Sequence, residues 1–171
     1  MKRLIIATLG VLLLIQATSG AMTATTTSSY CVDAQEHEFL KLINQFRSAH
    51  GRRPLSMTQT LGAASDHHST SMATYNYFSH DLTPEGITWS QNMANHGYDY
   101  NVYKGENIAA GRKTALAAFN QFKNSPTHRD VMLSGKFTAI GIGRAYKEGS
   151  TYGWYWTTDF GGKVDGKATI C

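Results

Sequence analysis

The sequence is poor in charge, proline and cysteine. Charged residues make up 16% of its 171 residues, against about 25% in typical globular domains, and it holds three prolines and two cysteines. Hydrophobic residues reach 42% and aromatic residues 11%, which excludes disorder of the whole chain. At roughly 100–200 residues per domain, the length predicts one compact domain.

Several functional signatures are also missing. No basic run is longer than Arg52-Arg53, and no stripe of Lys and Arg with interleaved aromatic residues is present, so we expect no nucleic-acid partner. The sequence has no HExxH, GxSxG or CxxC motif and no Gly-rich phosphate loop. Ordinary zinc proteases and acyl hydrolases therefore lack direct support, and no catalytic residue is identified.

The N-terminal region is typical of an export signal. Lys2-Arg3 precedes an apolar run from Leu4 to Ile15, and Ser19-Gly20-Ala21 fits the small-x-small pattern of a cleavage site. The run of about 12 residues is short for a membrane-spanning helix, which needs about 20. We therefore expect cleavage and no stable membrane span, with an uncleaved anchor as the alternative.

These features predict a secreted, extracellular protein. Residues 1–21 are expected to form the signal peptide, 22–35 a Thr/Ser-rich leader and 36–171 the folded domain. Disulfides are common in exported proteins, so Cys31 and Cys171 are expected to pair and close a loop of about 140 residues. Two free thiols or an intermolecular bond would be the alternative.

Hydrophobic periodicity changes along the chain from a helical to a strand pattern. Apolar residues at three- and four-residue spacing predict helices, and Ser125-Pro126 predicts the start of a further one. The helical segments are 36–50, 61–75, 88–96 and 114–123. From Ile140 onward, alternation predicts an antiparallel hairpin with one aromatic face that we expect to be buried. Helices followed by strands indicate an α+β fold.

Three potential ligands lie where predicted elements begin or end. His80 follows the second predicted helix, Glu106 lies in an expected loop, and His128 lies in a first helical turn. The positive end of the helix dipole disfavours a protonated imidazole there, which leaves a nitrogen free to ligate or to accept a proton. A hydrogen-bonded scaffold without a ligand is the alternative. His68 lies on an apolar helical stripe and is expected to be a hydrogen-bonded histidine at the edge of the core or behind a ligand.

Five short motifs occur in order between about residues 36 and 161. They are Leu42-Ile43-Asn44-Gln45-Phe46-Arg47, Tyr77-Phe78-Ser79-His80, Gly105-Glu106-Asn107-Ile108-Ala109, Ser125-Pro126-Thr127-His128-Arg129 and Gly141-Ile142-Gly143. Each motif is loose alone, but the ordered set is specific. It resembles the CAP superfamily of cysteine-rich secretory, antigen 5 and pathogenesis-related proteins, also called the SCP domain, in its bacterial form.

The resemblance implies an α-β-α sandwich with a central antiparallel sheet flanked by helices. It also implies a cleft where His80, Glu106 and His128 match residues that bind a divalent metal in many members, so the expected cofactor is a divalent metal, with zinc favoured. Ser125 stands where eukaryotic members carry a further glutamate. The resemblance therefore implies at most three protein ligands and a site open to water.

The sequence favours a binding or effector module over an enzyme. We expect a monomer whose partner is an extracellular small molecule, lipid or protein. One alternative is a metal-dependent hydrolase that uses the same three residues. A second is an extracellular lipid or sterol carrier, which needs an apolar groove separate from the cleft. A third is a purely structural module at the cell surface.

Overall fold

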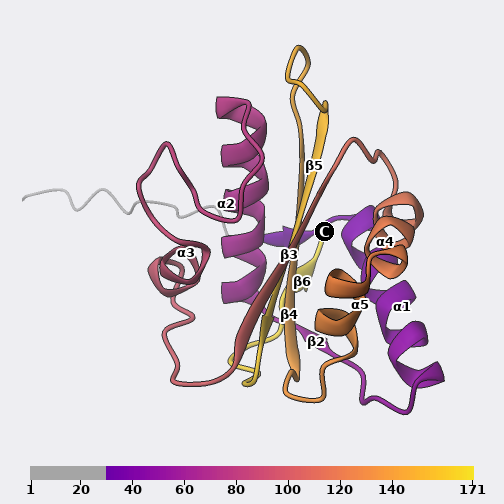
Figure 1. The fold of residues 1–171 in the computed structure, drawn as a ribbon. Coiled ribbons are helices and arrows are strands. Elements are labelled where there is room, and N and C mark those ends of the chain that lie inside the picture. Colours follow the sequence, from indigo (N-terminus) through magenta and orange to yellow (C-terminus); the bar gives the residue numbers. More distant parts are fainter. Residues whose placement is uncertain (1–29) are drawn as a thin grey trace, which may run out of the picture.

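A computed structural model describes residues 30–171, which form a β-sheet between two groups of helices (Figure 1). The elements are β1 (Cys31–Val32), α1 (Ala34–Ala49), β2 (Ser56–Met57), α2 (Gln59–Tyr75), α3 (Trp89–Asn95), β3 (Lys104–Ala110), α4 (Ala115–Asn124), α5 (Pro126–Leu133), β4 (Ala139–Tyr146), β5 (Trp154–Gly161) and β6 (Thr169–Ile170). The expected signal peptide and most of the expected leader lie outside the described residues. Within the described part, no helix is long and apolar enough to cross a membrane.

The helices lie where the sequence predicts them, and their first residues explain why they begin there. Asp33 caps α1 in a capping box, in which the Glu36 side chain accepts a hydrogen bond from the Asp33 amide. Thr88 begins α3 in the same way. Ser125 occupies the N-cap position of α5 and Pro126 follows it, but the Ser125 side chain makes no capping hydrogen bond.

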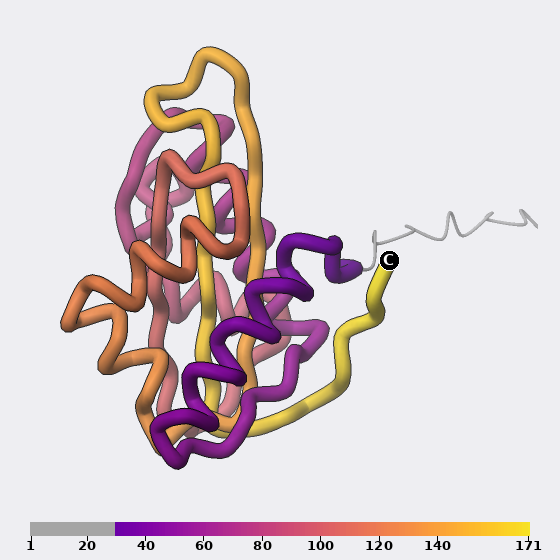
Figure 2. The backbone as a smooth tube through the Cα atoms, turned by 90° about the vertical axis from the view of Figure 1, so that its right-hand side faces the viewer, coloured from indigo at the N-terminus to yellow at the C-terminus, as the bar shows by residue number. Residues whose placement is uncertain are grey.

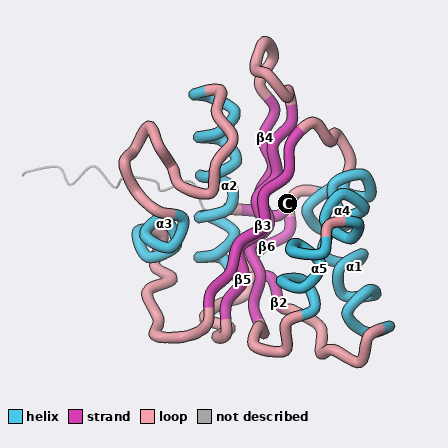
Figure 3. Tube along the Cα trace, viewed as in Figure 1, coloured by secondary structure: helices cyan, strands magenta, loops and turns pink. Residues whose placement is uncertain are grey.

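The central sheet has the strand order β2-β4-β5-β3. The pair β4-β5 is antiparallel, as the predicted hairpin requires, and β5-β3 is antiparallel as well. The short β2 joins β4 in parallel, so the sheet is mixed. The segment 105–109, expected to be a loop, is instead the middle of β3 (Figure 3). Residues 106–109 are all buried, so apolar and polar side chains do not alternate there and no strand pattern is visible.

Helices cover both faces of the sheet and confirm the sandwich. In Figure 1, α2 and α3 lie on one side and α1, α4 and α5 on the other. On the second side, Phe39 of α1 packs against Phe119, Phe122 and Trp156, with ring centroids 5.8 to 6.1 Å apart. Trp156 belongs to the predicted aromatic face, and its burial confirms that part of the prediction.

The two ends of the described chain lie side by side (Figure 2). The strands β1 and β6 form a separate parallel pair, and the predicted disulfide between Cys31 and Cys171 is present. Because β1 and the start of α1 precede residue 36, ordered structure begins before the expected domain boundary.

Candidate functional site

Glu106 is buried at the centre of a hydrogen-bonded cluster. Its Oε1 is 2.7 Å from His80 Nδ1, and its Oε2 is 2.7 Å from His68 Nδ1. His68 comes from α2 and is completely buried, with its Nε2 placed 3.0 Å from the Ser79 carbonyl oxygen. The cluster therefore ties β3, α2 and the loop after α2 together. His68 is buried with an acceptor oxygen near each ring nitrogen, which agrees with the hydrogen-bonded histidine that the sequence predicts.

His128 approaches from the other helical layer. It lies in the first turn of α5, and its backbone oxygen accepts a hydrogen bond from Asn107 Nδ2 at 3.0 Å, which attaches this turn to β3. The Phe122 ring packs against the imidazole at 5.1 Å. The Nδ1 atom of His128 is buried and has no hydrogen-bond partner among the described residues. Such an atom is costly to bury without a partner.

His80 and His128 face one cavity of about 470 Å³. Its lining residues are Phe78, Ser79, His80, Asp81, Ile108, Gln121 and His128. Glu106 does not line the cavity and lies behind His80, to which it is hydrogen-bonded. The three residues singled out in the sequence thus converge, with two imidazoles at the cavity and the carboxylate supporting one of them.

The two imidazoles have opposite electrostatic environments. The hydrogen bond that His80 donates to Glu106 raises the pKa of His80, against the effect of partial burial. Burial lowers the pKa of His128, and the charge on His80 lowers it further. The neutral form expected for His128 from its place at a helix start is thus also favoured by its burial.

Asp159 is a further member of the cluster that sequence reasoning missed. It stands opposite Glu106 in the register of β3 and β5 and is fully buried, and Ser65 Oγ donates to its Oδ2 at 3.0 Å. Burial raises the pKa of Asp159 well above its ordinary value, and the charge of Glu106 adds to this. In the sequence Asp159 looks like a solvent-facing residue on a hairpin with one aromatic face. Its burial follows from α2 covering that second face.

The donor set fits a two-imidazole metal site better than a three-ligand one. Both oxygens of Glu106 are engaged by histidine rings. Of Glu106 and His80, only His80 lines the cavity, so its second ring nitrogen is the atom that can bind a ligand there. Across residues 30–171, no group of three or more His, Cys, Asp or Glu side chains is placed to hold a metal ion. Metal binding by His80, Glu106 and His128 remains a prediction.

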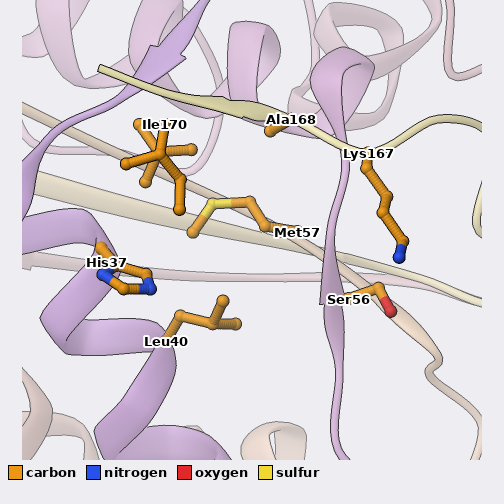
Figure 4. Close-up of a pocket in the computed structure, with 8 residues that line it drawn as sticks. His37, Leu40, Ser56, Met57, Lys167, Ala168 and Ile170 are labelled. Atoms are coloured by element: carbon orange, nitrogen blue, oxygen red, sulfur yellow. The ribbon is translucent and has the colours of Figure 1, made fainter.

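A separate apolar groove lies between α1, β2 and the C-terminal segment (Figure 4). It encloses about 200 Å³ and is lined by Val32, His37, Leu40, Ser56, Met57, Lys167, Ala168 and Ile170. None of the residues of the Glu106 cluster contributes to it. Small-molecule sites usually enclose about 300–1,000 Å³, so this groove is small for a lipid or sterol.

Two bacterial proteins show how far the likeness to known chains extends. The chain is 35% identical over 147 residues to the uncharacterized protein YkwD of Bacillus subtilis. This match covers 86% of this chain and 54% of YkwD. It is also 31% identical to an extracellular protein of Bacillus anthracis that contains an SCP domain, with a TM-score of 0.66. That match covers 74% of this chain and 40% of the solved one. The chain thus spans about half the length of these relatives.

A third protein shares the fold. An outer surface protein of Borrelia burgdorferi is 19% identical, with a TM-score of 0.66, and the match covers 74% of this chain and 91% of that one. The sequence model of the CAP family, described as the cysteine-rich secretory protein family, matches residues 40–160. This match includes the Glu106 cluster and all of the central sheet except Gly161 at the end of β5. The chain therefore belongs to the cysteine-rich secretory protein family, CAP.

Proposed function

We propose that this chain is an exported CAP domain that binds a divalent metal ion, with zinc favoured, through the imidazoles of His80 and His128. The observation that carries the proposal is that both rings face one cavity while Glu106 holds the Nδ1 side of His80. Export is supported by the disulfide and by the solved relative described as extracellular. In this role the protein is a binding module rather than an enzyme.

Glu106 acts in this proposal as a positioning residue. A metal-binding histidine usually donates its second N–H to a carboxylate, which fixes the ring and its tautomer. With Nδ1–H of His80 directed to Glu106 Oε1, the Nε2 lone pair is left for a ligand. His68 on Oε2 keeps the carboxylate in place. When bound, the metal would supply a Lewis acid with coordination positions open to an oxygen or nitrogen ligand.

Removing either imidazole is expected to weaken zinc binding at least tenfold. His80→Ala and His128→Ala each take away one of two protein ligands, and Glu106→Gln is expected to cost about 10- to 100-fold because it disturbs the ring that it supports. Isothermal titration calorimetry on chelator-treated protein measures all three. His50→Ala is the matched control, since His50 is exposed and its ring nitrogen lies 2.8 Å from the Phe46 carbonyl oxygen, away from the cavity. Unchanged zinc affinity in both cavity variants would overturn the proposal.

Zinc affinity is expected to fall as the pH is lowered through the raised pKa of His80. Only the unprotonated ring binds a metal, and the Glu106 hydrogen bond keeps His80 protonated to a higher pH than an ordinary histidine. Competition by protons therefore begins above the usual value of about 6.5. Glu106→Gln removes the cause of the shift, so the midpoint in a zinc titration series should move to lower pH. A midpoint unmoved by this substitution would contradict the assigned role of Glu106.

A metal-dependent hydrolase would use the same cavity but needs a general base near the bound water. Glu106 is a weak candidate because both of its oxygens are engaged. Turnover of an ester, peptide or phosphodiester by zinc-loaded protein, lost in His128→Ala, would favour the hydrolase over the binding module. The lipid-carrier alternative would have to use the small apolar groove, and its size argues against that role.

A further inference from the structure

Cationic side chains from separate loops gather at one end of the sandwich, which we call the basic end. Its members are Arg52, Arg53, Lys104, Lys136 and Lys163. Lys104 begins β3, and the loops that carry the other four lie at the lower end of the molecule in Figures 1 and 2. The sheet register explains this, since Lys104 at the start of β3 pairs with Gly161 at the end of β5, and the Thr138 amide donates to the Gly161 carbonyl at 2.9 Å.

In the described part of the chain, the cations of the basic end have no carboxylate within ion-pair distance. Within residues 30–171, none of the five takes part in an ion pair. Two carboxylates lie in the same loops, Asp99 and Asp165, and the Thr60 hydroxyl donates to Asp165 at 2.7 Å. Unpaired charges of one sign on neighbouring loops raise the local potential and attract ions of the opposite sign.

A buried guanidinium adds to this potential. Arg47 is 1% exposed and donates to the backbone carbonyls of Arg53, Met132 and Ser134 at 2.6 to 3.0 Å, without a carboxylate among its bonded partners in the described chain. Burial, and then the charge of Arg52, lowers the pKa of Arg47. Because arginine stays protonated at neutral pH, its charge acts on the same loops that it holds together.

The basic end also contains a groove of about 430 Å³. It is lined by Asn101, Val102, Tyr103, Lys136 and Gly162. The Lys136 ammonium lies 4.1 Å from the centre of the Tyr103 ring, and the Lys163 ammonium lies 3.8 Å from the centre of the Tyr100 ring. Ring contacts of this kind restrict both ammonium groups; Lys136 lines the groove, and Lys163 follows Gly162 of its lining. Tyr103 is 62% exposed and offers an apolar ring with a polar tip.

We propose that the basic end binds an acidic polysaccharide, with a sugar unit in the groove and its anionic groups on the surrounding cations. A concave site with an amide, an aromatic ring and flanking ammonium groups suits a polar, anionic polymer better than a membrane surface, which would be met by a projecting apolar segment. This inference is independent of the metal cavity, because it uses none of that cavity's residues.

Dextran sulfate and neutral dextran test the proposal, since they share a backbone and differ in charge. The unaltered protein is expected to bind dextran sulfate and not dextran, with an affinity that falls steeply with added salt. Lys136→Ala/Lys163→Ala should weaken binding about tenfold at low salt. The control Lys113→Ala/Lys147→Ala removes the same charge from exposed positions away from the basic end and should change binding less than about twofold.

Three results would overturn the proposal. They are no binding of dextran sulfate, equal losses in the two double variants, or tighter binding to vesicles of anionic phospholipid than to dextran sulfate. Equal losses would mean that net charge alone is responsible. His80→Ala serves as a second reference, because it should weaken zinc binding at least tenfold and leave dextran sulfate binding unchanged. The failure of one proposal is therefore distinguishable from the failure of the other.

Discussion

Gly141→Ala is expected to destabilise the domain by about 3 kcal/mol or more. A Cβ at this position in β4 would overlap the backbone carbonyl of Leu61 and the amide nitrogen of Gly62, which belong to α2. Backbone atoms cannot rotate away as a flexible side chain can, so α2 would have to move off the sheet. Urea unfolding followed by circular dichroism measures the loss.

The same substitution is expected to disturb the Glu106 cluster. α2 carries His68, whose ring bonds to Glu106, and Ser65, whose hydroxyl bonds to Asp159. A displaced helix would stretch both contacts, so zinc affinity should fall together with stability. Gly166→Ala is the matched control, because a Cβ there would meet no atom within 4 Å. Equal unfolding midpoints for the two variants would show that the close approach of α2 to β4 is not needed.

The parts of the fold that sequence analysis predicts are those with a local signal. The helices have a periodic apolar face and recognisable starting residues, such as Asp33 in α1 and Thr88 in α3. The strand β3 has neither, since covered strands show no alternation and its small residues suggest a loop. The layered arrangement comes from the resemblance to a family, because the order of strands in a sheet leaves no mark on single motifs.

The candidate site, too, is only partly predictable from the sequence. His80 and His128 lie in recognisable motifs, but the part that Glu106 takes depends on the register of β3 against β5 and on the rotation of α2. Those two features bring Asp159 and His68 to it, and neither is visible in the sequence. The basic end is similar, because its cations are scattered along the chain and form no run, and only the meeting of loops at one end of the sheet unites them.

Loss of the disulfide is expected to destabilise the domain at least as much as Gly141→Ala. Cys31→Ser/Cys171→Ser should lower the free energy of unfolding by about 4 to 5 kcal/mol in the chain-entropy view, because the bond closes a loop with a sequence separation of 140. For a domain of this size the melting temperature should fall by roughly 10–20 °C. Scanning calorimetry measures the melting temperature. The unaltered protein in reductant, which also lacks the bond, should melt at the same temperature as the double variant.

Removal of the disulfide should also loosen the C-terminal segment locally. Among residues 30–171, β6 is exposed and pairs with the two residues of β1 alone. Few other backbone bonds hold the C-terminal segment there, such as those from the Ala168 amide to Met57 and from the Cys171 amide to Val32, both 3.1 Å. Amide hydrogen exchange should therefore speed up first over residues 166–171 and around the apolar groove. If the double serine variant matched the oxidised protein in stability and in exchange, the packing of β1 on β6 would suffice without the bond.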